Sequence, residues 1–91
     1  MNIYAIIHVD IGEGSSYEPK IVAIAQSYET ACHVADLKHE ELQREFEENF
    51  PNGKLNVSTE KDFIRAVDEN CSHGWQFKIQ KIIMDHSFTI V

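Results

Sequence analysis

The chain has little of what marks several common protein classes. No run of apolar residues approaches the roughly 18 that a membrane-spanning helix needs. The apolar residues of segment 2–9 have no basic region before them and are interrupted by Tyr4 and His8, unlike a signal peptide. Basic residues are scarce, since 8 lysines and arginines face 15 aspartates and glutamates, for a net charge of −7. We therefore expect a cytoplasmic protein that binds neither membranes nor nucleic acid directly, because both require a basic surface.

Cysteine is also rare, with only Cys32 and Cys71. Without a secretory signal, two reduced structural thiols are expected. His33, Asp36 and Glu40 share a helical face, but their spacing does not match a structural zinc site, which favours closely spaced cysteines. The sequence therefore predicts no metal and no cofactor.

The composition is that of an ordinary globular protein, with 43% hydrophobic and 25% charged residues. A length of 91 residues suits one domain. We therefore predict a single small α+β domain covering residues 1–91.

Three segments have the pattern of β-strands. Residues 2–9 alternate with period two, and residues 20–27 are apolar on both sides, so the two predict an antiparallel hairpin joined by the polar loop 10–19. Residues 75–84 alternate again and predict a half-buried strand. Residues 54–57 are short and extended and give a candidate for a brief strand, and residues 86–91 are an optional last strand.

Two segments have features of helices. The first begins at Ser27, a residue that caps helices, and ends near Phe50, because Pro51 cannot continue a helix. The second begins at Ser58 or Thr59 and ends at Gly74. Its expected buried stripe consists of Phe63, Ile64, Val67 and Cys71. The predicted fold is a three- or four-stranded, mainly antiparallel sheet with two helices on one face, in the order strand, strand, helix, helix, strand.

The first predicted helix carries most of the negative charge. It contains seven carboxylates, which face only Lys38 and Arg44, so its net charge is −5. Glu40 is placed to pair with Arg44. Such a carboxylate row can occupy a basic groove of another protein, or it can simply keep a small protein soluble. The predicted partner-binding residues are Glu40, Glu41, Glu45, Glu47 and Glu48.

Other chemically suggestive groups are weaker. Cys32, Asp36 and His39 share a helical face and combine a thiol, a carboxylate and an imidazole. A catalytic cysteine, however, usually sits at a helix start or meets its base on another element. We therefore predict a non-enzymatic protein with no catalytic residues. Trp75 and Phe77 could stack nucleic-acid bases, but they lack a basic groove and are expected in the core.

Parts of the sequence resemble small uncharacterised phage and prophage proteins. These parts are NIYAIIHVD, the polar loop with EPKIVAIAQSYETA after it, and a late strand that begins near Trp75. The resemblance implies a mobile-element origin, and proteins of this kind include host-directed inhibitors such as anti-CRISPR proteins. It identifies no functional residue.

Three hypotheses follow. The first is an acidic binding protein, in concrete form a phage-encoded inhibitor that covers the basic, nucleic-acid-handling surface of a host protein. The second is a small structural or regulatory domain that forms a homodimer through the edge of strand 75–84 or the tail 88–91. The third is a cysteine-dependent enzyme.

Overall fold

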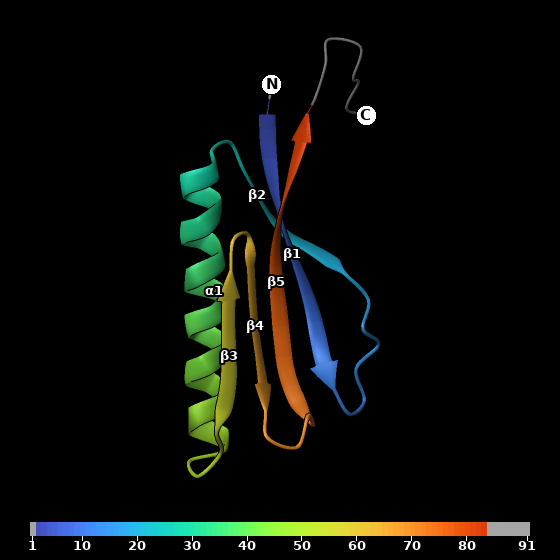
Figure 1. The fold of residues 1–91 in the computed structure, drawn as a ribbon, viewed down its shortest axis with the longest axis vertical. Helices are drawn as coiled ribbons and strands as arrows, with labels where there is room; N and C mark the ends of the chain where they lie inside the picture. The colour runs from blue at the N-terminus through green and yellow to red at the C-terminus, as the bar shows by residue number, and fades with distance from the viewer. Residues whose placement is uncertain (1, 84–91) are drawn as a thin grey trace.

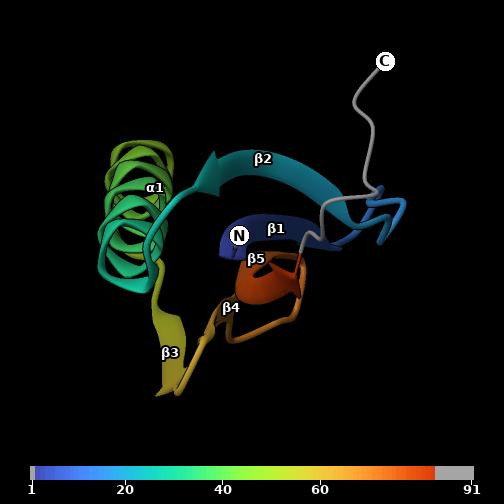
Figure 2. The same ribbon diagram turned by 90° about the horizontal axis from the view of Figure 1, so that it is seen from above.

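The computed structural model describes residues 2–83 and forms one five-stranded antiparallel sheet with a single helix on one face (Figure 1). The elements in chain order are β1 (Asn2–Gly12), β2 (Lys20–Ala25), α1 (Tyr28–Asn49), β3 (Leu55–Glu60), β4 (Phe63–Asp68) and β5 (His73–Ile83). The strand order in the sheet is β2-β1-β5-β4-β3. Seen from above, the sheet curves and α1 lies to one side of it (Figure 2).

The first hairpin confirms the prediction made for it. β1 and β2 pair antiparallel, with Tyr4 opposite Ala25 at one end. The register shifts between two residues of β1, since Ile6 pairs with Ala23 and Ile7 with Ile21. The extra residue in β2 is a β-bulge, which bends the strand and disturbs its ladder locally.

The acidic helix is confirmed, including its start. The backbone N–H of Thr30 donates to the Oγ of Ser27 at 3.1 Å, so Ser27 is the N-cap. At the other end the N–H of Phe50 donates to the carbonyl of Phe46 at 2.8 Å. α1 does not have the apolar length that a membrane-spanning helix requires.

The second predicted helix is wrong, and so is the fold class built on it. The segment forms the hairpin β3–β4, whose tight turn contains Asp62 at φ 64°. Aspartate tolerates this left-handed conformation because its short side chain bonds locally. The apolar spacing of Phe63, Ile64 and Val67 suits a helix, but it suits equally a strand that is covered on both faces. The observed fold has five strands and one helix within residues 2–83.

Gly74 belongs to β5 and does not end a helix. A Cβ at Gly74 would lie 2.5 Å from the carbonyl oxygen of Ala66, so only glycine allows β4 and β5 to approach this closely. β5 is an inner strand between β1 and β4, and the free edge expected for a homodimer is therefore not there. The optional strand and the tail lie outside the described residues.

The core fills the space between α1 and one face of the sheet. Ala31 and Ala35 are small, so the helix can approach the sheet closely. Trp75 and Phe77 of β5 are only 5% and 2% exposed, which confirms that both are core residues. The buried members of this cluster are Ile6, Ala25, Ala31, Ala35, Phe46, Ile64, Ala66, Trp75 and Phe77.

Candidate functional site: an acidic groove beside the helix

A groove of 470 Å³ opens beside the C-terminal half of α1. Residues from α1 line it together with residues 10–16 of β1 and its loop and residues 72–75 at the start of β5. The α1 residues in the lining are Leu42, Glu45, Phe46, Asn49 and Phe50. Three segments far apart in the sequence therefore meet at this end of the molecule (Figure 1).

The groove combines acidic side chains with an apolar floor. Glu45 from the helix and Asp10 and Glu13 from the β1 side all line it, and no lysine or arginine does so within residues 2–83. Phe50, Leu42 and Ile11 supply accessible apolar surface in the same lining, and the nearly buried Phe46 and Trp75 lie beneath it. Apolar anchoring surface with charged groups at fixed positions is typical of a binding groove. The sign of the charge suits a basic and partly apolar segment of another protein.

The five predicted partner-binding glutamates do not act as one surface. All five are exposed. At about 100° of rotation per residue, Glu41, Glu45 and Glu48 lie on one flank of α1, whereas Glu40 and Glu47 lie on the outer side. Glu45 lines the groove, and Glu41 lines a smaller hollow beside His8. The expected pair between Glu40 and Arg44 is not formed, since the ion pairs within residues 2–83 are both His–Asp contacts.

Asp10 lies beside a histidine. Its Oδ1 lies 3.0 Å from the Nε2 of His8. The geometry does not satisfy a hydrogen bond, so Nε2 has no hydrogen-bonding partner within residues 2–83. The Asp10 side chain is 65% exposed, so its carboxylate remains accessible in the groove.

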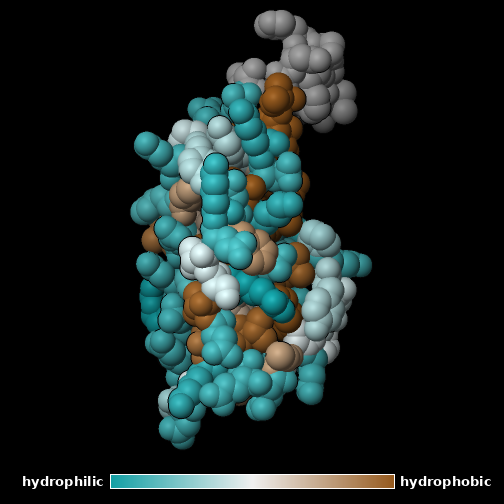
Figure 3. Space-filling view, viewed as in Figure 1, coloured by the Kyte–Doolittle hydropathy of each residue, from teal (hydrophilic) through white to brown (hydrophobic). Residues whose placement is uncertain are grey.

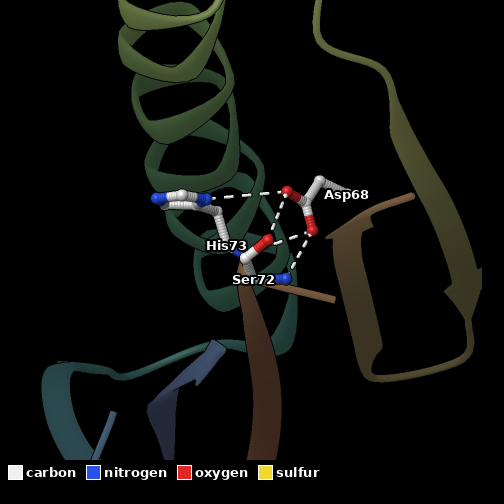
Figure 4. Close-up of polar contacts among 3 residues, drawn as sticks. All are labelled: Asp68, Ser72 and His73. Carbon is white, nitrogen blue, oxygen red and sulfur yellow. Dashed lines mark hydrogen bonds and ion pairs between the residues drawn. The ribbon is translucent and has the colours of Figure 1, made fainter. Parts of the chain in front are cut away.

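Asp68 holds the β4–β5 turn through contacts with Ser72 and His73 (Figure 4). Ser72 and His73 line the groove, whereas Asp68 lines a second hollow beside it. Its Oδ1 accepts the backbone N–H of Ser72 at 2.7 Å and that of His73 at 3.2 Å. Its Oδ2 lies 3.4 Å from the Ser72 hydroxyl and 3.5 Å from the His73 Nδ1. Burial raises the pKa of Asp68, but the two backbone N–H groups and the imidazole outweigh it, so the pKa lies below its ordinary value.

These three residues have the types of a hydrolytic triad but not its arrangement. In a triad the histidine lies between the serine and the aspartate. Here the carboxylate is central, and both the hydroxyl and the imidazole approach the same oxygen. Asp68 therefore stabilises the turn and orients His73, whose ring lies 4.6 Å from that of Phe50. His73 and Phe50 together line the groove and this second hollow, which has a volume of 500 Å³.

The helical row considered for a cysteine enzyme, Cys32, Asp36 and His39, stays on α1, and its histidine is in contact with the core. The Trp75 Nε1–H donates to the Nδ1 of His39 at 3.0 Å. The lone pair of this nitrogen is therefore engaged in a hydrogen bond and does not accept a proton from a thiol. Burial lowers the pKa of His39, against the opposing effect of Asp36 and Glu40. Cys32 is half-buried, and both cysteines are free thiols. No cluster of metal-binding side chains occurs in the described part of the chain.

Sequence reasoning found one member of the groove and missed the others. Glu45 was predicted from the helix alone. Asp10 and Glu13 lie in a glycine-containing segment, and this composition predicts a turn. It does not predict that the turn lies beside the C-terminal half of α1. The spacing of Asp68 and His73 across a short turn was the available signal for their contact, and it was hidden by the helix prediction.

Apolar side chains reach the surface mainly over the strands, whereas hydrophilic residues dominate the helix side (Figure 3).

In comparisons with protein-family models, curated proteins and solved structures, no match to this chain was found. The groove itself therefore carries the functional argument.

Proposed function

We propose that this chain is a non-enzymatic binding protein whose groove receives a basic segment of a partner protein. One observation carries the proposal: Glu45 of α1 meets Asp10 and Glu13 of the β1 side across an apolar floor. The concrete form that follows from the sequence resemblance is a phage-encoded inhibitor that acts in the host cytoplasm on a basic, nucleic-acid-handling surface.

The two components of the groove have different roles in this proposal. The carboxylates raise the rate of association with a basic partner, and salt screens this effect because the Debye length is only about 8 Å at 0.15 M. The accessible apolar side chains of the lining, Phe50, Leu42 and Ile11, add contact area from which a bound segment excludes water. Binding should therefore weaken with salt without vanishing.

The test is capture of partners from bacterial lysate with three forms of the tagged chain. These are the wild type, Glu45→Lys in the groove, and Glu47→Lys on the outer side of the same helix. Both variants change the net charge by the same amount, so a general charge effect reduces capture equally. We expect Glu45→Lys to lose a salt-sensitive partner that Glu47→Lys retains.

Two outcomes contradict the proposal. One is equal capture of every partner by the wild type and Glu45→Lys. The other is capture that does not respond to salt between about 0.05 and 0.5 M, a range over which the Debye length falls severalfold. Circular dichroism spectra of both variants check that each is folded.

A further inference from the structure

The sheet has a second face, which no helix covers within the described residues (Figure 2). We call this the open face. The pairing register identifies its members, because residues directly opposite each other in a ladder point to the same side of the sheet. Ile6 and Phe77 belong to the core against α1, so their neighbours in the strands point the other way. The apolar residues of the open face over β2, β1 and β5 are Ile3, Ala5, Ile7, Val9, Ile11, Ile21, Ile24 and Ile82.

This surface is more apolar than an ordinary exposed sheet face. All five outward positions of β1 are apolar, whereas its helix-facing positions include His8 and Asp10. Ile21 and Ile24 of β2 are 60% and 62% exposed. They lie opposite Ile7 and Ala5, so they extend the apolar surface of β1 to the edge of the sheet. Contiguous apolar patches of this kind mark interaction sites.

We infer that the open face over β1 and β2 packs against the same face of a second copy of this chain. Two sheets stacked face to face interdigitate their side chains at a spacing of about 10 Å. Such packing needs an apolar sheet face as the partner, and the chain supplies one in its own open face. A two-fold axis that places β1 near β1 of the partner meets this requirement with one self-complementary patch.

The charges favour this arrangement of two equally charged copies. The carboxylates of α1 lie on the opposite side of the sheet, so stacked open faces place both acidic helices on the outside. The two helices are then separated by two sheets, well beyond a Debye length of about 8 Å. The charged residues at open-face positions of the described strands are Arg65, Lys78 and Glu60. Arg65 and Glu60 lie on β4 and β3, away from β1 and β2, whereas Lys78 of β5 lies directly opposite Ile7 and borders the apolar patch.

The area suits a weak dimer. β1 has eleven residues and β2 has six, so at about 3.3 Å per residue they are roughly 36 Å and roughly 20 Å long. At a strand spacing of about 4.8 Å, the two strands cover roughly 270 Å² of sheet per copy. Two copies reach roughly 540 Å², below the roughly 1,000 Å² of a stable specific interface. A weak, reversible dimer is therefore the expected result.

The bulge in β2 favours face packing over edge pairing. Bulges at sheet edges disturb the row of free N–H and C=O groups that another strand would need. β2 has such an irregularity opposite Ile6 and Ile7. The outer edge of β2 is therefore a poor template for a partner strand, while Ile21 and Ile24 still project from its face.

The test is the mass of the full chain in solution, by sedimentation equilibrium from about 1 µM to about 500 µM, a range suited to an interface of this size. We expect the mass to rise from 10.5 kDa toward twice that value. The variant with Ile21→Lys and Ile24→Lys should weaken the dimer at least about tenfold, because it places charge in an apolar contact. Leu37→Lys is the control for a lysine at an exposed apolar position on the helix side, since Leu37 is 45% exposed on α1, and it should not change the mass.

Each other result overturns the inference. A wild type that is monomeric throughout excludes the second copy, and a dimer insensitive to the isoleucine changes lies elsewhere. If the wild type is monomeric and the Phe88→Lys variant dimerises, the chain's own residues 84–91 occupy the face and the inference is wrong. Glu45→Lys should leave the dimer unchanged, so failure of the groove proposal and failure of this one are distinguishable.

Discussion

Both faces of the sheet carry large apolar residues, but the two faces differ in how much of that apolar surface water can reach. The face toward α1 holds Trp75, Phe77 and Ile6, all nearly inaccessible to water. The open face holds isoleucines and a valine that stay partly or largely accessible. The contrast is sharpest in β1, because its more apolar side is the one turned away from the helix.

The comparison shows that an alternating pattern marks two sides of a strand but does not say which side receives the helix. In β5 the helix-facing side carries the large aromatic residues, and the opposite side carries Gln76, Lys78 and Gln80. The orientation of β5 also fixes which side of β1 points to the helix, because the two strands pair along their whole length. The apolar side of β1 is therefore left without a helix.

The largest expected difference between the faces is in stability. Phe77→Ala should lower the free energy of unfolding by about 3–5 kcal/mol, because it leaves a cavity in the core. Ile24→Ala, at an exposed site, should cost less than about 1 kcal/mol in dilute solution. Urea unfolding followed by the fluorescence of Trp75 measures both.

Phe77→Ala can unfold a small domain altogether, so Phe77→Leu serves as the milder variant, with an expected cost of roughly 1–2 kcal/mol. Equal costs for Phe77→Ala and Ile24→Ala would contradict the assignment of the two faces.

A second effect concerns the contact between β4 and β5. Gly74→Ala places a methyl group 2.5 Å from the carbonyl oxygen of Ala66, closer than van der Waals contact. The strands must then separate, and we expect a loss of about 1–3 kcal/mol of unfolding free energy. Gly14→Ala is the control for loss of a glycine, since a Cβ there meets no atom within 4 Å, although its φ of 78° carries a local cost. A Gly74→Ala chain as stable as the wild type would place β4 and β5 further apart than described.

The smallest expected effect is a pH dependence that originates on the helix-covered face. The folded-state pKa of His39 lies below its ordinary value because the ring is buried, despite the raising effect of Asp36 and Glu40. Between the folded pKa and the ordinary value near 6.5, the unfolded chain binds a proton that the folded chain does not. This contribution to stability is therefore present above about pH 6.5 and is lost as the pH falls.

Urea midpoints of the wild type at pH 7.5 and pH 5.5 test this expectation, with His39→Gln as the control for the other titrating groups. The wild type should lose more stability between the two pH values than His39→Gln does. Identical losses would show that the contact between His39 and Trp75 does not couple proton binding to folding.

Much of the secondary structure was predictable from local signals. Ser27 and Pro51 bracket α1 in the sequence, and the alternation of residues 2–9 indicated β1. The β3–β4 hairpin was not predictable in this way. Ser58, Thr59 and Glu60 have the residue types of a helix start, but they lie in a strand, because pairing with β4 outweighs weak local preferences.

The candidate site was predictable only in part, for a related reason. The charge of α1 is a property of composition, so Glu45 could be named from the sequence. Its partners Asp10 and Glu13 lie more than thirty positions away, and no local pattern indicates that the β1–β2 loop and the end of α1 line one groove.

The sequence by itself determined the net charge, the capped acidic helix, the first hairpin and a last strand over residues 75–83. These features depend on neighbouring residues, whose preferences act over a few positions of the chain. Only the tertiary structure decided that residues 58–68 form strands and their turn and not a helix, that β5 lies inside the sheet, and that one apolar face stays open. Those outcomes depend on pairing and packing between distant segments, where the burial of a whole face outweighs the preferences of any single turn.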